Sequence, residues 1–235
     1  MIVGLSNDFQ KEKRILVCSI AAYRGKSLPP GFAVLIRSCM RFGIQIRFFG
    51  FDKYWQDMYH TKFIHLLECI RALRNEYDYV IAVDAEDIVF LRPLEEIYEI
   101  ATTFQDVTWC AERNCFPHPE LASQYPMAPT SYKYLNGGGF FGKINDVVDC
   151  MEKVSAWIGD HNDDQAVLSK AYISGQFPIK LDYHCKVFQS LFAHKNTDLE
   201  IQPDHKIWNP ETQTFPCILH ANGKTQHMAA YRRFE

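Results

Sequence analysis

Three carboxylates lie within four residues, between two apolar runs. Asp84, Glu86 and Asp87 follow the run at 79–83 and precede the run at 88–91. Apolar runs rich in β-branched residues are typical of buried strands, and open α/β sheets bind ligands at the carboxyl ends of such strands. Because Mg²⁺ and Mn²⁺ take carboxylate and phosphate oxygens, we predict that Asp84 and Asp87 bind a divalent metal that holds a nucleotide diphosphate. The alternative is a solvated acidic turn.

A histidine and a lysine near the end of the chain add groups that such a site uses. His220 ends an apolar run, and Gly223 and Lys224 follow it closely. Imidazole is a suitable third ligand for Mn²⁺ beside two carboxylates. A glycine turn that carries a lysine can contact a phosphate. The alternative for His220 is a purely structural role.

Two polar clusters in the middle of the chain are further candidates. Asn136 and Gly137 begin a glycine run after an apolar residue. This pattern indicates a place where the backbone comes close to a ligand, or else a β-bulge or hairpin turn. Asp163 and Asp164 stand just before a short helical pattern, so helix capping explains at least one of them.

Alternating strand and helix patterns must position these residues. After a loop at 25–30, a helix from Pro30 to Gly43 joins strands at 14–20 and 44–49 in a right-handed βαβ unit. Further helices are predicted at 63–73, 93–104, 144–158 and 164–172, and further strands at 79–91, 106–111, 134–142 and 217–220. The glycine run opens the strand at 134–142 as a turn, and the long aperiodic segment 112–133 is expected to be a functional or mobile loop. We predict a single α/β domain over residues 1–235, a sandwich with a mixed central sheet flanked by helices.

The composition is that of an ordinary globular α/β domain. The 235 residues are 47% hydrophobic and carry a net charge of −3, which demands neither nucleic acid nor membrane as a partner. There is no apolar run long enough for a membrane span, and the first seven residues are too few and too polar for a signal peptide. The eight cysteines are scattered without a CxxC pair, which indicates reduced thiols. We therefore expect a cytoplasmic protein with no membrane partner.

Taken together and in order, these motifs resemble the glycosyltransferase domain of the procollagen lysyl hydroxylases, a GT-A-like nucleotide-sugar transferase. The resemblance covers most of the chain, and its most specific segments are 83–87, 111–117 with 124–126, 134–138, 163–165, 181–184 with 188–189, and 220–223.

The resemblance implies a role for each matched residue. Asp84, Asp87 and His220 would bind Mn²⁺, with Mg²⁺ as the alternative ion. The donor, a UDP-sugar, would be contacted by Lys62, with Ser19 and its neighbours lining the nucleotide pocket and Trp55 in the loop beside the site. Asp163 and Asp164 would bind the donor sugar or take the proton of the acceptor.

Two departures from the family pattern bear on the substrates. The family has an aromatic residue that contacts uracil between its metal aspartates, and here Glu86 stands in that place. A carboxylate cannot stack on a base, so the metal assignment is more secure than the uridine assignment. The expected lack of a secretory signal and of a hydroxylase domain argues against collagen itself as the acceptor.

The function predicted from the sequence is transfer of a sugar from a nucleoside-diphosphate donor to a hydroxyl group. One alternative is a nucleotidyltransferase, which uses paired aspartates on a similar fold. Another is an inactive module that binds a sugar nucleotide or a glycan. The acceptor is either a hydroxylysine of a collagen-like protein or a hydroxylated DNA base. For the DNA base, six basic residues are candidates for a phosphate-binding face: Arg41, Arg47, Lys180, Lys186, Arg232 and Arg233.

Overall fold

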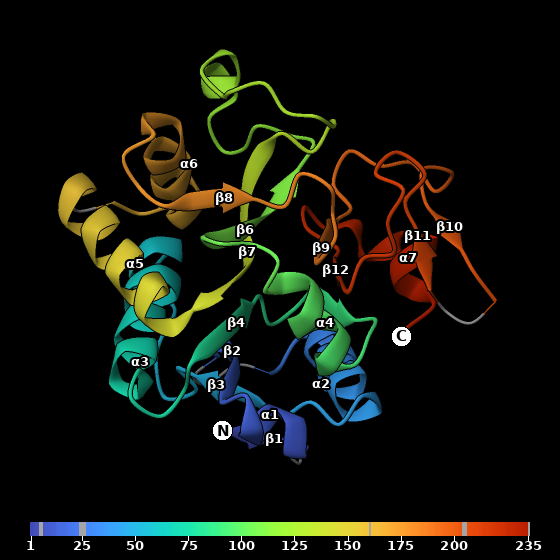
Figure 1. The fold of residues 1–235 in the computed structure, drawn as a ribbon, viewed down its shortest axis with the longest axis horizontal. Coiled ribbons are helices and arrows are strands. Elements are labelled where there is room, and N and C mark those ends of the chain that lie inside the picture. Colours follow the sequence, from blue (N-terminus) through green and yellow to red (C-terminus); the bar gives the residue numbers. More distant parts are fainter. Residues whose placement is uncertain (5–6, 24–26, 160, 204–205, 235) are drawn as a thin grey trace.

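A large mixed sheet forms the centre of the molecule (Figure 1). The computed structural model describes residues 1–4, 7–23, 27–159, 161–203 and 206–234. In these residues the sheet has seven strands in the order β1-β3-β2-β4-β7-β6-β8. Their bounds are Ile2–Val3 for β1, Ile15–Ile20 for β2, Ile46–Phe49 for β3, Tyr79–Val83 for β4, Val107–Glu112 for β6, Tyr134–Lys143 for β7 and Ile179–Leu181 for β8.

The strand directions follow from how the chain connects them. β3, β2 and β4 are parallel neighbours, as expected for strands joined by crossover helices. β7 runs antiparallel to both β4 and β6, and β6 pairs in parallel with β8. At the opposite edge β1 pairs antiparallel with β3. The sheet is thus mixed, with β3, β2 and β4 as a parallel block, which confirms the predicted fold class.

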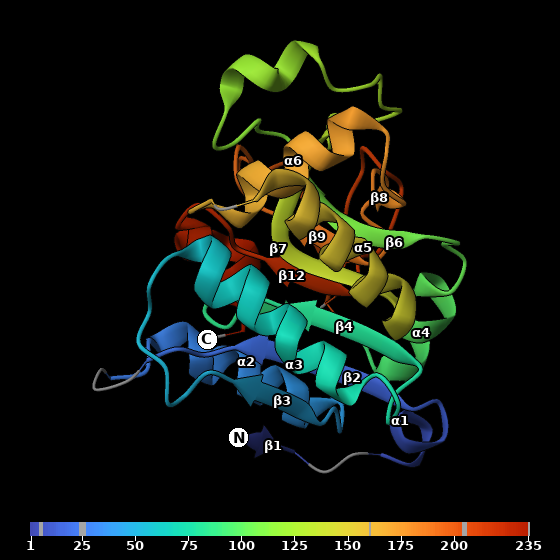
Figure 2. The same ribbon diagram turned by 90° about the vertical axis from the view of Figure 1, so that its left-hand side faces the viewer.

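Helices cover both faces of this sheet (Figures 1 and 2). The core on one face includes side chains of α3 (His65–Leu73), α5 (Ile144–Ile158) and α6 (Asp164–Ser174), and the core on the other includes side chains of α2 (Pro30–Arg41) and α4 (Leu94–Ala101). A π-helical turn at Met58–Ile64 leads into α3. Two short helices, α1 (Asp8–Glu12) and α7 (Ala229–Arg232), lie near the ends of the chain.

A second, smaller sheet meets the large one at the acidic turn. Its strands are β5 (Ile88–Phe90), β12 (Ile218–His220) and β9 (Phe188–Ser190), with β12 in the middle, antiparallel to β5 and parallel to β9. A two-stranded ribbon of β10 (Glu200–Ile201) and β11 (Ile207–Trp208) lies beyond it. The predicted strand at 79–91 is therefore two strands that belong to different sheets. The acidic residues form the junction between them.

Several predicted boundaries need correction. The residues at 134–142 form one continuous strand without a glycine turn. The helix predicted to reach residue 104 ends at Ala101, and the helix predicted from residue 63 starts with the π-helical turn at Met58. The segment 113–133 is irregular apart from a 3₁₀ turn at Pro119–Ser123. Residues 25 and 26 of the predicted loop at 25–30 lie outside the described residues.

Two further observations concern the cysteines and the helices. All eight cysteines are free, and all but Cys69 are buried. In the part of the chain that the structure describes, no helix has both the length and the apolar character needed to cross a membrane.

Candidate metal and nucleotide site

The turn that carries the three carboxylates is held on both sides. The backbone N–H of Asp84 donates to the carbonyl of Gly138 in β7 at 3.0 Å. The N–H of Ala221, just after β12, donates to the carbonyl of Asp87 at 2.8 Å. The position of the acidic side chains is therefore set by both sheets and does not depend on the turn alone.

His220 joins Asp84 and Asp87 because of the pairing in the small sheet. In the antiparallel β5–β12 pair His220 stands opposite Ile88, one residue after Asp87. Its Nε2 atom lies 3.3 Å from Asp87 Oδ1 and 3.7 Å from Asp84 Oδ2. One ligand atom from each of the three residues lies within 4.8 Å of the others. Residues 133 or more positions apart in sequence thus meet as the sequence predicted.

Asp84, Asp87 and His220 form a triad whose charges shift one another's pKa values. Burial alone would raise the pKa of Asp87, but the positive charges of His220 and Lys62 outweigh it and hold that pKa below its usual value. Burial alone would lower the pKa of His220, but the carboxylates of Asp87 and Asp84 outweigh it and raise that pKa. The carboxylates of the triad therefore stabilise a positively charged group placed between them.

The donor set fits a divalent cation of the Mn²⁺ type. Two carboxylates and an imidazole are ligands that Mn²⁺ accepts, and three protein ligands leave coordination positions for oxygens of a substrate. Within the described residues, the buried atoms Asp87 Oδ1 and His220 Nδ1 make no hydrogen bond of ordinary geometry. Buried polar atoms rarely stay without a partner, so Asp87 in particular has an oxygen in place for a ligand.

Glycines of β7 make room for the site. A Cβ atom at residue 138 would lie 1.9 Å from Cε1 of His220, so no other residue fits there with the ring in place. A Cβ at residue 137 would lie 3.2 Å from Oδ2 of Asp164. The glycine run was interpreted as a turn near a ligand. Residues 137–139 instead lie within one continuous strand, at an irregularity in its pairing where Trp109 faces Phe140 but Cys110 faces Asn136, which agrees with the β-bulge left open by the sequence. Side chains of the candidate site come close to these glycines.

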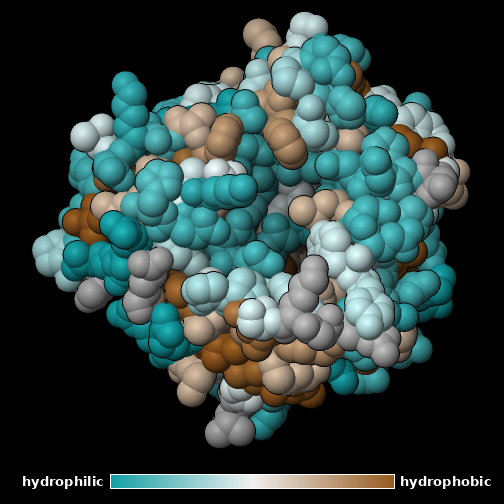
Figure 3. All heavy atoms as spheres, turned by 180° about the vertical axis from the view of Figure 1, so that it is seen from behind, coloured by the Kyte–Doolittle hydropathy of each residue, from teal (hydrophilic) through white to brown (hydrophobic). Residues whose placement is uncertain are grey.

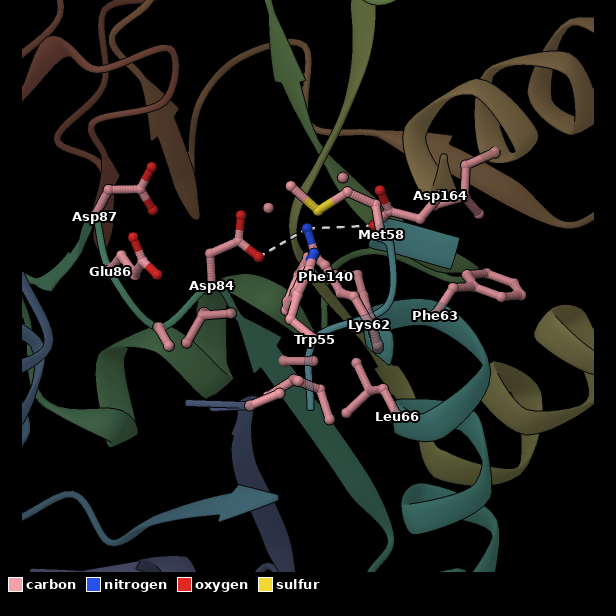
Figure 4. Close-up of a pocket in the computed structure, with 18 of the residues that line it drawn as sticks. Trp55, Met58, Lys62, Phe63, Leu66, Asp84, Glu86, Asp87, Phe140 and Asp164 are labelled. Carbon is pink, nitrogen blue, oxygen red and sulfur yellow. Dashed lines mark ion pairs between the residues drawn. The ribbon is translucent and has the colours of Figure 1, made fainter. Parts of the chain in front are cut away.

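Lys62 links the metal triad to α6. Its Nζ lies 2.7 Å from Asp84 Oδ1 and 3.2 Å from Asp164 Oδ2, at the centre of the cavity in Figure 4. Burial alone would lower the pKa of Lys62, but the two carboxylates outweigh it and raise that pKa. The ammonium group therefore stays charged between them.

The two aspartates at the start of α6 occupy different environments. The carboxylate of Asp163 accepts a hydrogen bond from the N–H of Ala166 at 2.8 Å, which is the N-cap interaction expected from the sequence. Asp164 is buried and lines the cavity. Burial raises its pKa to about 6; Lys62 opposes the shift, and Asp84 and Asp163 add to it.

A cavity of about 460 Å³ connects these groups. One wall is acidic and comes from the turn at 84–87, and Lys62 and Asp164 stand across from it (Figure 4). The rest is largely apolar and includes Trp55, Phe140 and Leu66. The face of the molecule seen in Figure 3 is hollowed near its middle, with hydrophilic side chains around much of the hollow.

A buried carboxylate that the sequence did not point to ties the elements of the site together. Glu112, at the end of β6, accepts hydrogen bonds from the side-chain amides of Asn136 at 3.0 Å, Gln165 at 2.8 Å and Asn222 at 3.0 Å. Burial raises its pKa, and the three amides partly offset the shift. Gln165 also accepts from the N–H of Gly137 and donates to the carbonyl of Phe116. Glu112 lies in the segment 111–117 of the family resemblance but was given no role there. Of the three amides, Asn136 was a predicted site residue, and Gln165 and Asn222 each lie one or two residues from one.

Of the remaining predicted residues, some line the cavity and others do not. Trp55 lines it and is 44% exposed. Ser19 is fully buried in β2 and is not among the described residues that line the cavity, although Ile20 next to it is. Gly223 and Lys224 are exposed residues with left-handed backbone, outside the described lining. Binding roles for Ser19, Gly223 and Lys224 stay predictions.

The six basic residues considered for DNA are spread over the molecule. Arg47 is on β3 and Lys180 is on β8, and four strands separate β3 from β8 in the sheet order (Figure 1). Arg41 ends α2, and Arg232 ends α7. Arg47 and Lys180 therefore lie far apart in the sheet order, and a single phosphate-binding face that uses all six residues stays a prediction.

The chain is similar to proteins that share this set of motifs. The family model of the PLOD GT domain matches residues 11–232. An uncharacterized protein of Acanthamoeba polyphaga mimivirus is 31% identical over 177 residues, which cover 72% of this chain and 37% of that protein.

Two animal relatives are named for their activities. The procollagen-lysine,2-oxoglutarate 5-dioxygenase of Drosophila melanogaster is 28% identical over 82% of this chain and 29% of its own length. The human multifunctional procollagen lysine hydroxylase and glycosyltransferase is 24% identical over 93% of this chain and 31% of its own length. The chain thus spans about a third of the length of the curated relatives that it matches.

Proposed function

The chain belongs to the PLOD GT domain family of glycosyltransferase domains, and from that premise we propose that it transfers a sugar from a nucleoside-diphosphate donor to a hydroxyl group in a metal-dependent reaction. The observation that carries this proposal is the meeting of Asp84, Asp87 and His220 at the carboxyl end of a central strand, with Asp164 across the same cavity.

The triad would hold the metal ion, which we propose to be Mn²⁺. Such an ion supplies positive charge to the oxygens of the diphosphate leaving group as the bond to the sugar breaks, an effect worth several kcal/mol. Asp84 and Asp87 would bind it through oxygen and His220 through Nε2, the ring nitrogen that faces both carboxylates.

Lys62 and Asp164 supply the protein's own part of the chemistry. The ammonium group of Lys62 is held between two carboxylates at the centre of the cavity, where it can donate to an oxygen of the diphosphate. Asp164 lies on the far side of Lys62 from the acidic turn (Figure 4), where it can orient the donor sugar or accept the proton of the attacking hydroxyl. Its burial, which raises its pKa to about 6, makes it a better proton acceptor than an ordinary aspartate and leaves it ionised at neutral pH.

For the substrates, we propose a UDP-sugar donor and a hydroxylysine of a collagen-like protein as the acceptor. The relatives whose names refer to procollagen lysine support a collagen-like acceptor. The scattered basic residues give no support to the alternative, a hydroxylated DNA base. The cytoplasmic location expected from the sequence stays a prediction.

Product analysis tests the proposal. The chain is incubated with Mn²⁺ and a panel of nucleotide sugars, and with nucleoside triphosphates plus sugar phosphates. We expect release of a nucleoside diphosphate from a nucleotide sugar, and faster release when a hydroxylysine peptide is added. Release of pyrophosphate from a triphosphate would establish the nucleotidyltransferase alternative instead. Faster release with hydroxymethylated DNA and not with the peptide would reverse the assignment of the acceptor.

A further inference from the structure

One carboxylate on the cavity wall has no part in the metal triad. Glu86 lies between Asp84 and Asp87 in sequence, and its side chain lines the cavity. The hydroxyl of Tyr23, which follows β2, donates a hydrogen bond to Glu86 Oε1 at 2.8 Å. Tyr23 lines the same cavity. The two residues form a pair whose chemistry the transfer reaction leaves unexplained.

The pair is held in place by the start of α2. A Cβ atom at Gly31 would lie 1.5 Å from the carbonyl oxygen of Glu86, so the helix packs directly on the backbone of the turn. The ring of Tyr23 packs edge-to-face on Phe32, with 6.2 Å between the ring centroids. The backbone of Glu86 and the ring of Tyr23 are thus both held by the first turn of the same helix.

The pair presents only hydrogen-bond acceptors to a ligand. The hydroxyl proton of Tyr23 is used toward Glu86, so lone pairs remain on the phenol oxygen and on both carboxylate oxygens. Burial, followed by the hydrogen bond to Glu86, raises the pKa of Tyr23, and the phenol therefore keeps its proton at neutral pH. A group that binds here must bring N–H or O–H donors.

The position of the pair indicates which part of a nucleotide sugar it would meet. In Figure 4 Asp84 stands between Glu86 on one side and Lys62 and Asp164 on the other. If the diphosphate lies at the triad and the sugar lies toward Asp164, the nucleoside lies toward Glu86.

We propose that Glu86 and Tyr23 select the base of the donor nucleotide by accepting a hydrogen bond from a ring N–H on its pairing edge. Uracil and guanine present such an N–H. Cytosine and adenine present a ring nitrogen lone pair there, which the carboxylate repels. This inference rests on the proposed function. It means that this chain would recognise the base by hydrogen bonding and not by stacking on an aromatic residue in the place of Glu86.

Nucleotide affinity tests this inference separately from catalysis. UDP, GDP, CDP and ADP are titrated into the chain in the presence of Mn²⁺, with binding measured by calorimetry. We expect UDP and GDP to bind at least about tenfold more tightly than CDP and ADP, because cytosine and adenine place a ring-nitrogen lone pair where uracil and guanine place an N–H donor. Glu86→Gln, whose amide offers both a donor and an acceptor, is expected to reduce this preference to about threefold or less.

Two further variants complete the test. Tyr23→Phe is expected to weaken the preference in part, because Glu86 loses the hydrogen bond that orients it. Glu99→Gln, an exposed substitution on α4, is the matched control and is expected to keep the full preference. Equal binding of all four nucleotides to the unaltered chain, or an unchanged preference in Glu86→Gln, would overturn the inference and leave the proposed function standing. If no nucleotide binds with Mn²⁺ present, the proposed function fails as well.

Discussion

Two neighbouring aspartates at the start of α6 have different roles, and the difference can be measured in the rate of the reaction. Asp163 caps the helix, which an asparagine does equally well. Asp164 is buried beside Lys62 and has a pKa raised to about 6 by its burial. We predict that Asp164→Asn lowers kcat by about 10² to 10⁴, the usual worth of a positioned proton acceptor. Asp163→Asn is expected to change kcat by less than about threefold, because capping is kept. Steady-state kinetics of nucleoside diphosphate release would show the contrast.

The opposite ranking of the two variants would assign the catalytic role to Asp163. Equal, small effects would mean that the proton goes to another group. Thermal unfolding of both variants provides the control for folding.

Gly138 is required by the ring of His220 and not by backbone conformation. We predict that Gly138→Ala weakens Mn²⁺ binding by at least about tenfold, because the new methyl group displaces the imidazole. Gly139→Ala is the matched control, since a Cβ there would meet Phe188, which belongs to the hydrophobic core. It is expected to destabilise the fold by about 1–3 kcal/mol and leave the affinity for Mn²⁺ nearly unchanged. Calorimetric titration of Mn²⁺ into both variants separates the two effects. Unchanged Mn²⁺ affinity in Gly138→Ala would argue against His220 as a ligand.

At the scale of elements, Gln165 connects α6 to two other parts of the site. Its side chain accepts from the N–H of Gly137 in β7 and donates to the carbonyl of Phe116 in the irregular segment 113–133. We predict that Gln165→Leu increases amide hydrogen exchange in residues 113–123 by about tenfold, because the segment loses this anchor. Gln176→Leu, an exposed change just after α6, is the control and should leave the exchange unaltered. Unchanged exchange in both variants would mean that other contacts hold the segment.

The elements themselves were largely predictable, because each is encoded locally. Apolar periodicity predicted the βαβ unit at the start of the chain, and a capping residue predicted the start of α6. The split of residues 79–91 between two sheets was not predictable, because it depends on pairing β5 with β12, about 130 residues later. The glycines at 137–139 were misinterpreted as a turn for the same reason: His220 and Phe188, which need the space, are remote in sequence.

The candidate site was likewise predictable only in part. Asp84, Asp87 and His220 are residue types that indicate metal binding, so the sequence alone suggested that they form one site. Glu112 had no such signal. It was predicted to be the first residue of the aperiodic segment 112–133, and its role appears only when three amides from separate elements converge on it. Ser19 was expected near the nucleotide from its position at a strand end; its side chain is buried and its neighbour Ile20 lines the cavity, so its role stays a prediction.

At the scale of the whole molecule, His194 makes stability depend on pH. Its side chain is fully buried and lies 2.9 Å from the hydroxyl of Tyr132. Burial, together with the charge of Arg113, lowers its pKa to about 4. Between about pH 6.5 and pH 4 the unfolded chain binds a proton at this residue that the folded chain does not. The free energy of unfolding therefore rises with pH across this window and falls as the solution is acidified, by an amount on the order of 3 kcal/mol.

Denaturant unfolding between pH 4 and pH 8 measures this dependence. His194→Gln is expected to flatten the slope in that window, whatever it does to stability at pH 8. His227→Gln, which changes an exposed histidine, should keep the slope of the unaltered chain. If the slope is the same in all three proteins, the acid sensitivity comes from groups other than His194.

The central claim is that the triad at the junction of the two sheets holds a metal ion that donor turnover requires. The most direct measurement is nucleoside diphosphate release from a UDP-sugar by the unaltered chain and by Asp87→Ala, each with EDTA and with added Mn²⁺. Asp149→Ala, an exposed change on α5, is the control. We predict that EDTA stops release by the unaltered chain and by the control, that Mn²⁺ restores it in both, and that Asp87→Ala shows none under either condition. Full activity of Asp87→Ala in the presence of EDTA would contradict the claim.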